Sequence, residues 1–184
     1  YVEGGDPALT DVVFDGNFSG YCGGGMYVGG GTATLTHVTF SNNSALDDVA
    51  MVGYAGGGLY VDGWGAPAGA ELSHVTFGGN AAGDSGGGMY VFYGDVTLSD
   101  VTFSANFARS GGGGGLYAIY STVSLTDVAF TDNTTIFGGR GGGMSLLGAN
   151  TATLTNVTFS GNATEGTTNA EGGGLYIEGE EGSQ

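Results

Sequence analysis

The sequence predicts an all-β protein, a right-handed parallel β-helix: a solenoid of about six rungs with three short strands in each. Two observations lead to this fold class. A Phe-x-x-Asn motif recurs six times, and a Gly-Gly-Gly block follows each copy. Repeats with a period of about 20–50 residues are the sequence signature of solenoids, propellers and arrays. The motif phenylalanines are Phe14, Phe40, Phe77, Phe103, Phe130 and Phe159, and the glycine blocks start at Gly23, Gly56, Gly86, Gly113, Gly141 and Gly172.

The first strand of each rung is expected around a leucine. Residues 151–155 are Thr-Ala-Thr-Leu-Thr, so polar and apolar side chains alternate as they do in a half-buried strand. The next apolar residues, Val157 and Phe159, follow Leu154 at odd steps, which predicts a bend between the leucine and the valine. Each unit has a residue type that favours turns at the bend. These residues are Asp11, His37, His74, Asp100, Asp127 and Asn156.

Two further strands complete the predicted rung. Val-Thr-Phe forms a second short strand with its threonine outward, and Ser-x-Asn makes a corner. The Gly-Gly-Gly-Leu-Tyr segment then starts a third strand, with Leu116 inward, Tyr117 outward and Ala118 inward. A single rung buries too little apolar surface to offset its ordering entropy, so the rungs must stack. Stacking predicts a ladder of inward corner asparagines that hydrogen-bond to the turn backbone and to each other.

Charge narrows the possible partners. The 184 residues include 18 acidic residues, no lysine and only two arginines, giving a net charge of −16. This balance makes binding to nucleic acid, acidic lipid head groups or polyanionic sugars unfavourable. No apolar run approaches the ~20 residues that a membrane-spanning helix needs, so we expect no membrane insertion. Cys22 is the only cysteine and is expected to be a small buried filler.

The whole chain, 1–184, is predicted to be one β-helix domain. It begins at Tyr1 without a methionine or a signal-like segment, which indicates a processed product or an excerpt of a longer chain or, when its two ends are considered, a subunit of a filament. Neither end of the sequence contains a segment typical of a solenoid cap. Uncapped strands are templates for further pairing, so we expect end-to-end self-association into a fibre.

The candidate binding surface is an outward tyrosine column interrupted at Ser145. We expect a line of exposed phenol rings, with neighbouring glycines leaving the ring faces open. Such a line would contact glycans or, laterally, a second fibre. The alternative is that the rings form cross-strand pairs that only stabilise the sheet. The tyrosine column consists of Tyr27, Tyr60, Tyr90, Tyr117 and Tyr176.

Five Asn-x-Ser/Thr sequons are present. Those at Asn17, Asn133 and Asn162 belong to the predicted ladder, so their side chains are expected to point inward and be unavailable. Asn42 and Asn156 lie at predicted exposed corners and are the glycosylation candidates. The sequence therefore predicts a glycoprotein modified at these two corners if its source is eukaryotic.

No catalytic residue, cofactor or metal site is predicted. Asp100 and Asp127 occupy the same corner of neighbouring rungs, as do His37 and His74, but solvated turn formers account for both pairs. A lyase or hydrolase would have to interrupt its own repeat to build an active site. The largest interruption combines Asp47–Tyr54 with Asp62–Trp64, so an active site would have to lie there.

The six Phe-x-x-Asn copies, alternating with Gly-Gly-x-Leu-type segments, resemble the repeats of chlamydial polymorphic outer-membrane proteins. They are also similar to the wider group of right-handed parallel β-helix surface proteins and autotransporter passengers. The resemblance implies an extracellular or cell-surface location and a non-catalytic structural or adhesive role, as a filament segment or an adhesin. The alternative is a carbohydrate-binding or polysaccharide-cleaving β-helix.

Overall fold

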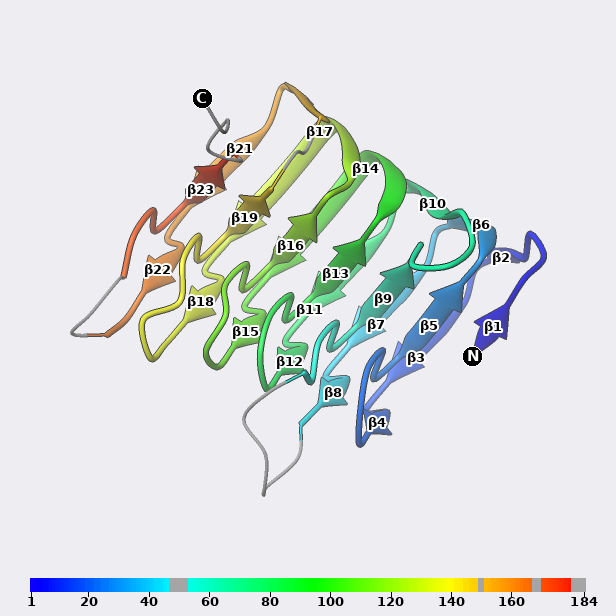
Figure 1. Ribbon diagram of the computed structural model, residues 1–184, viewed down its shortest axis with the longest axis horizontal. Helices are drawn as coiled ribbons and strands as arrows, with labels where there is room; N and C mark the ends of the chain where they lie inside the picture. The colour runs from blue at the N-terminus through cyan, green and yellow to red at the C-terminus, as the bar shows by residue number, and fades with distance from the viewer. Residues whose placement is uncertain (47–52, 149–150, 167–169, 180–184) are drawn as a thin grey trace.

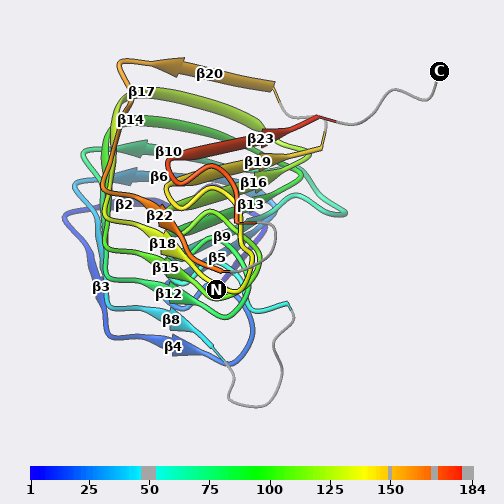
Figure 2. The same ribbon diagram turned by 90° about the vertical axis from the view of Figure 1, so that its left-hand side faces the viewer.

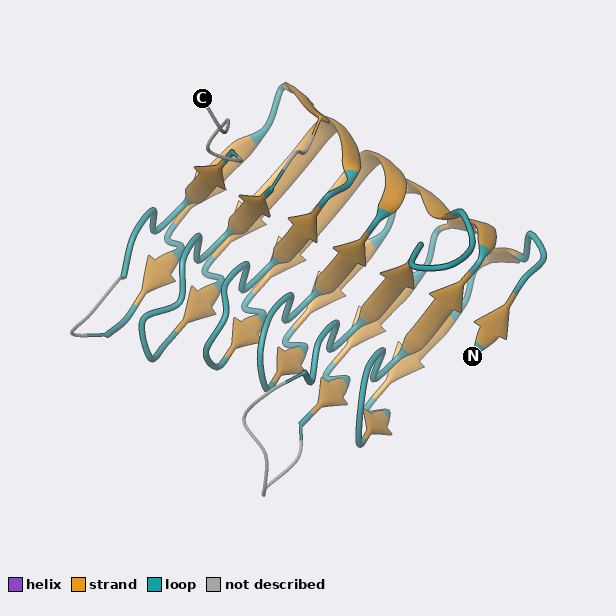
Figure 3. Cartoon of the chain, in the orientation of Figure 1, coloured by secondary structure: helices purple, strands orange, loops and turns teal. Residues whose placement is uncertain are grey.

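The computed structural model describes residues 1–46, 53–148, 151–166 and 170–179. In this part of the chain every regular element is a β-strand, and every strand pair is parallel, which confirms the all-β solenoid of about six rungs. Figures 1 and 3 show the strands of each sheet side by side in rung order, with β1 and β23 at opposite ends of the solenoid. Within these ranges nothing qualifies as a membrane-spanning helix.

Three sheets run along the solenoid. The seven-stranded sheet takes one strand from each Gly-Gly-Gly-(Met/Leu) segment, preceded by a strand at the N-terminus. Its strands face the viewer in Figure 1. They are β1 (Val2–Glu3), β5 (Met26–Gly29), β9 (Leu59–Asp62), β13 (Met89–Phe92), β16 (Leu116–Ile119), β19 (Met144–Leu147) and β23 (Leu175–Glu178).

The ten-stranded sheet contains both the leucine strands and the Val-Thr-Phe strands. The predicted bend is present, but the strands on either side of it stay in one sheet, and two rungs have a continuous strand. The leucine strands are β2 (Ala8–Thr10), β6 (Gly31–Thr36), β10 (Ala68–Ser73) and β20 (Thr151–Thr155), the Val-Thr-Phe strands are β3 (Val13–Asp15), β7 (Thr39–Ser41), β11 (Thr76–Gly78) and β21 (Thr158–Ser160), and the continuous strands are β14 (Gly94–Ser104) and β17 (Thr122–Thr131).

Left-handed backbone makes the bend. All six predicted turn residues, from Asp11 to Asn156, have φ between 53° and 56°. Asp, Asn and His tolerate this conformation better than most residues, which explains why only these types occupy the position.

The six-stranded sheet was not predicted as a sheet. Its strands are two residues long and begin directly after the motif asparagines. Figure 2 shows them stacked below the ten-stranded sheet. They are β4 (Phe18–Ser19), β8 (Ser44–Ala45), β12 (Ala81–Ala82), β15 (Phe107–Ala108), β18 (Thr134–Thr135) and β22 (Ala163–Thr164).

The core contains an unbroken stack of the motif phenylalanines. Adjacent ring centroids from Phe14 to Phe159 are 4.7–4.9 Å apart, and their planes differ by no more than 6°. These distances match the spacing between strands of a sheet, so the rings stack because the rungs do. The four inner rings, Phe40 to Phe130, are fully buried.

The asparagine ladder is also confirmed. Asn106 Nδ2 donates to the carbonyl oxygen of Phe77 and to Oδ1 of Asn133, both at 2.9 Å. The backbone N–H of Asn106 donates to the same Oδ1, at 3.0 Å. Asn80 makes the corresponding bonds to Asn106. Each inner asparagine therefore pairs its buried amide completely, with no need for water.

The glycine blocks allow two strands to approach closely. A Cβ on Gly87 would lie 2.3 Å from the carbonyl oxygen of Phe107, and one on Gly88 would lie 2.7 Å from that of Gly115 and 2.9 Å from the Phe103 ring. Gly86 has φ +65°, in the left-handed region. All three positions of the block thus require glycine.

Candidate functional site

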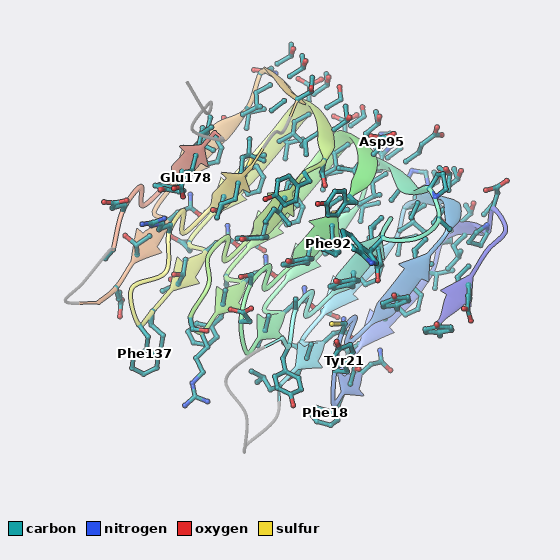
Figure 4. The ribbon with its side chains drawn as sticks, viewed as in Figure 1. Phe18, Tyr21, Phe92, Asp95, Phe137 and Glu178 are labelled. Carbon is teal, nitrogen blue, oxygen red and sulfur yellow. The ribbon has the colours of Figure 1, made fainter. Side chains whose placement is uncertain are left out.

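The outward surface of the seven-stranded sheet is rich in aromatic and aliphatic side chains, and we call it the aromatic face. Side chains alternate along each strand, so the second and fourth residues of these strands point away from the core. Figure 4 shows Phe92 near the middle of this surface. Besides the tyrosine column, the aromatic face comprises Trp64, Phe92, Tyr93, Ile119, Tyr120 and Leu147.

The tyrosine column is brought together as predicted, but its rings are not open. The Tyr27, Tyr60, Tyr90 and Tyr117 rings stack with centroids 4.9–5.3 Å apart and planes within 14° of parallel. The strand spacing of about 4.8 Å falls within the centroid separation that aromatic pairs prefer, so each ring covers the faces of its neighbours. The expectation of open ring faces is therefore wrong for this stack: Tyr27, Tyr60 and Tyr90 are half-buried, and Tyr117 is buried.

Burial changes the acidity of these phenols. It is the main cause that raises the pKa of Tyr27, Tyr60 and Tyr90 well above the ordinary value. It also raises the pKa of Tyr117 to about 12. The four hydroxyl groups therefore hold their protons more firmly than those of ordinary tyrosines.

Ser145 interrupts the column and leaves Tyr176 apart from the other tyrosines. Ser145 is completely buried, and its hydroxyl group has no hydrogen-bond partner among the described residues. The Arg140 guanidinium lies over the Tyr176 ring, 4.9 Å from the centroid, and forms ion pairs with Glu171 and Glu178. The last tyrosine therefore packs against a cation rather than against another ring.

A second group of rings lies beside the tyrosine column. Trp64 stacks on Phe92 with centroids 5.7 Å apart and an interplanar angle of 16°, and its other neighbour, Tyr93, meets it edge-on. Tyr93 stacks in turn on Tyr120, at 4.9 Å. Trp64 is 67% exposed. The sequence indicated only the interruption at Asp62–Trp64; the outward position of Phe92 could have been found from the period-two alternation of its strand.

A cavity of about 440 Å³ opens at the N-terminal end of the aromatic face. It lies where the fourth strand position, held by Phe92 and Ile119 in later rungs, is a glycine, Gly29. The cavity thus coincides with the predicted interruption at Asp62–Trp64; residues 47–52 of the other interruption lie outside the described residues. Its lining includes Tyr1, Glu3, Tyr27, Gly29, Asp62 and Trp64.

Asp62 organises one wall of the cavity. The Tyr27 hydroxyl donates to its Oδ2 at 2.7 Å, and the Trp64 backbone N–H donates to its Oδ1 at 2.9 Å. The same carboxylate thereby holds a ring of the column and the start of the loop that bears the tryptophan. The carboxylate is half-buried, and each oxygen still has a free lone pair.

The residues at the bend form a line of polar side chains, as predicted. The His37 and His74 rings are 5.0 Å apart. Oδ1 of Asp11 lies 3.7 Å from Nδ1 of His37, and Oδ2 of Asp100 lies 3.6 Å from Nε2 of His74. In the described ranges no three His, Cys, Asp or Glu side chains form a group that could hold a metal.

The two glycosylation candidates lie at exposed corners. Asn42 Nδ2 donates to Oδ1 of Asp15, and Asn156 Nδ2 donates to a carboxylate oxygen of Asp127. Hydrogen bonds from Ser41, the larger effect, and from Asn42 lower the pKa of the Asp15 carboxyl group.

The ladder sequons differ from one rung to another. Asn133 is fully buried and Asn162 is half-buried. Asn17 is exposed, but its amide group bonds to Asn43 as the ladder requires. The inward ladder position is therefore confirmed at all three sequons, while glycosylation itself stays a prediction.

Comparison with known proteins identifies a family model. The model described as "Right handed beta helix region" matches residues 3–181. No curated protein and no solved structure matches the chain.

Proposed function

The chain belongs to the right-handed β-helix family, and we propose that it is a non-catalytic structural or adhesive segment of an extracellular filament or surface-displayed protein. The resemblance to polymorphic outer-membrane proteins and autotransporter passengers supports the extracellular location. The regular outward columns support the absence of catalysis, because their polar members pair with neighbouring rungs. The bend residues are one example, with carboxylates beside His37 and His74.

The observation behind the filament role is the direction of the asparagine ladder. Between asparagines, each one donates to the Oδ1 of the following rung and accepts from the preceding one, as Asn43 does with Asn80 and Asn17. The Nδ2 of Asn43 also donates backward, to the carbonyl oxygen of Phe14. A further rung at either end of the described solenoid would continue the same bonds. Phe14 and Phe159 are only half-buried and each has one stacked neighbour, so a further rung would also cover an apolar ring. We propose that such rungs come from the same chain or from a second copy.

The adhesive role is assigned to the aromatic face. Closed ring faces in the tyrosine column leave its edges and hydroxyl groups for lateral contact with a second fibre. Ring stacking on a glycan would be restricted to exposed rings such as Trp64 and Tyr93, which are 67% and 41% exposed.

Light scattering of the purified chain over a range of concentrations tests the filament role. We expect the mean particle mass to grow with protein concentration and elongated particles to appear in electron micrographs. Phe14→Asp, which places a charge in the open cross-section, should suppress association. Val13→Asp is the matched control: Val13 is the neighbouring residue, is 66% exposed and points outward. A parent chain that stays monomeric, or equal effects of the two variants, would contradict the proposal.

Binding to immobilised glycans and to preformed fibres tests the adhesive role. Trp64→Ala should weaken whichever contact occurs. Phe137→Ala should not, because Phe137 is equally exposed at 66% but lies on a loop between the six-stranded and seven-stranded sheets. Figure 4 shows Phe137 at the opposite edge of the molecule from Asp95, away from Phe92. Equal losses in the two variants would refute a specific role for the aromatic face.

A further inference from the structure

The cavity at Gly29 has a distinctive arrangement of charge. Strand pairing places Glu3 beside Gly29, and Gly29 beside Asp62, at the same outward position of successive rungs. The two carboxylates are therefore two rung steps, about 10 Å, apart, on either side of a residue without a side chain. In later rungs Phe92, Ile119 and Leu147 occupy this position. The cavity is thus a gap in an otherwise filled column, with a negative charge on each side.

An indole ring forms another wall. One face of Trp64 stacks on Phe92, which belongs to the following rung. Trp64 lines the cavity together with residues of its own rung and of earlier ones, and we infer that its second face, opposite Phe92, borders the cavity. The face of an indole ring carries negative electrostatic potential and attracts cations more strongly than the other aromatic side chains do.

The charged side chains of the wall are both carboxylates, and its donors are the hydroxyl groups of Tyr1 and Tyr27 and the indole N–H of Trp64. Glu3 and Asp62 carry carboxylates, and the Tyr27 hydroxyl group uses its proton on Asp62, leaving only lone pairs. Neither arginine of the chain lines the cavity. The net charge of −16 adds a long-range attraction for positive ligands.

We propose that this cavity binds an organic cation with an alkylated ammonium group, of which choline is the simplest probe. The carboxylates supply charge and the Trp64 face supplies a cation–π contact. A primary ammonium group is strongly hydrated and loses more on leaving water, whereas methyl groups reduce that loss and fill the gap left by Gly29. A neutral sugar would accept this geometry but leave both carboxylate charges uncompensated. The site borders the end at which a further rung would add, because Glu3 lies on the terminal strand β1, but its lining residues all come from one chain, so the proposal does not require the filament role.

Trp64 is the only tryptophan, so its fluorescence reports on this cavity alone. We expect choline to change Trp64 emission and to saturate the site at a concentration on the order of 1 mM in low salt. The uncharged isostere 3,3-dimethylbutanol and methyl glucoside should not saturate it. Raising the ionic strength should weaken choline binding, because salt screens partly exposed charges.

Charge-removing variants test the two carboxylates. Asp62→Asn should weaken choline binding about fivefold, the effect of one nearby charge near a protein surface. Glu3→Gln should weaken it about twofold, because Glu3 is exposed. Asp95→Asn is the matched control, since Asp95 is an exposed carboxylate on the ten-stranded sheet. This variant should bind choline with the affinity of the parent.

Several outcomes would overturn the proposal. Equal binding of choline and its uncharged isostere would show an apolar pocket without cation recognition. Saturation by methyl glucoside but not by choline would identify a carbohydrate subsite. Equal losses in Asp62→Asn and Asp95→Asn would show attraction by net charge alone. Since Asp62→Asn also removes an acceptor of the loop, Glu3→Gln gives an independent result: unchanged affinity in that variant would remove Glu3 from the site.

Discussion

The phenylalanine stack inside the solenoid and the tyrosine column outside it follow the same geometric rule but tolerate change differently. Ring centroids are 4.7–4.9 Å apart in the stack and 4.9–5.3 Å apart in the column. The stack is unbroken, whereas the column is interrupted by Ser145 and lies beside the gap at Gly29. An inward substitution disturbs the rungs above and below, because no space or water is available to absorb it. An outward substitution disturbs only its neighbours, so the departures from the repeat, and with them the candidate binding features, lie on the outside.

The largest expected difference between the two regions is in cavity formation. Phe103→Ala should lower the free energy of unfolding by about 3–5 kcal/mol, because the fully buried ring leaves a space that the stacked neighbours cannot close. Phe92→Ala, on the aromatic face, should cost well under half as much, since Phe92 is half-buried. Urea unfolding of both variants measures the difference. Similar midpoints would show that the interior stack is not the main source of stability.

Substitutions in the asparagine ladder are expected to lower the free energy of unfolding by a smaller amount. Asn106→Ala should cost about 1–3 kcal/mol, because it leaves buried donors of Asn80 and the carbonyl oxygen of Phe77 without partners. Asn17→Ala removes the same side chain in the exposed first rung and should cost less, because water can replace its bonds. Thermal melts of the two variants compare these losses. An equal cost at the two positions would contradict the ladder's dependence on burial.

The interruption of the tyrosine column is expected to be mildly destabilising. Ser145→Ala should raise the free energy of unfolding by about 0.5–1 kcal/mol, because it removes a buried hydroxyl group that has no hydrogen-bond partner in the described chain. Ser121→Ala is the contrast: the Ser121 hydroxyl donates to the carbonyl oxygen of Ile119 at 2.8 Å, so its removal should destabilise. Urea midpoints that shift in the same direction for both variants would refute this assignment.

The smallest expected effect is a loss of stability at alkaline pH that comes from the tyrosine column alone, because phenylalanine has no group that titrates. The pKa of Tyr117 is about 12 in the folded chain and 10.0 ordinarily, so the unfolded state loses its proton first. The resulting stability is complete below about pH 10 and is lost as the pH rises through about 12. Tyr27, Tyr60 and Tyr90 shift in the same direction. Absorbance at 295 nm should show these phenols ionising above pH 10 and together with unfolding; complete ionisation near pH 10 in a folded chain would contradict the stack.

Much of the interior could be predicted from the sequence because it repeats. The recurring phenylalanine and asparagine positions indicated the stack and the ladder, and odd spacing around Leu154 indicated the bend. The six-stranded sheet was missed because strands of two residues, such as Ser44–Ala45, are too short to show alternation. The closed faces of Tyr60 and its neighbours were missed because outward exposure was inferred without considering the rung spacing.

The cavity could be only partly predicted. The interruption at Asp62–Trp64 gave its position in the sequence, but its floor is Gly29 and one flank is Glu3, which belong to earlier rungs. Only the register of β1, β5 and β9 brings these residues together. A glycine among many glycines gives no local signal. Gly29 is recognised as a gap only when the strands are aligned and Phe92 and Ile119 are seen to occupy the same position in later rungs.

The most direct test of the claim that binding arises where the outward repeat is interrupted is a choline titration of Gly29→Ile, followed by Trp64 fluorescence. A Cβ at Gly29 would meet the Cε1 edge of the Tyr27 ring at 2.7 Å, so this ring, which stacks on Tyr1 and Tyr60, must shift as the gap fills. Gly78→Ile is the control, because a Cβ there meets only Ser104 Oγ, at 3.7 Å. We predict that Gly29→Ile abolishes saturable choline binding and lowers the urea midpoint without unfolding the chain, while Gly78→Ile binds as the parent does. Undiminished choline binding by a folded Gly29→Ile chain would contradict the claim.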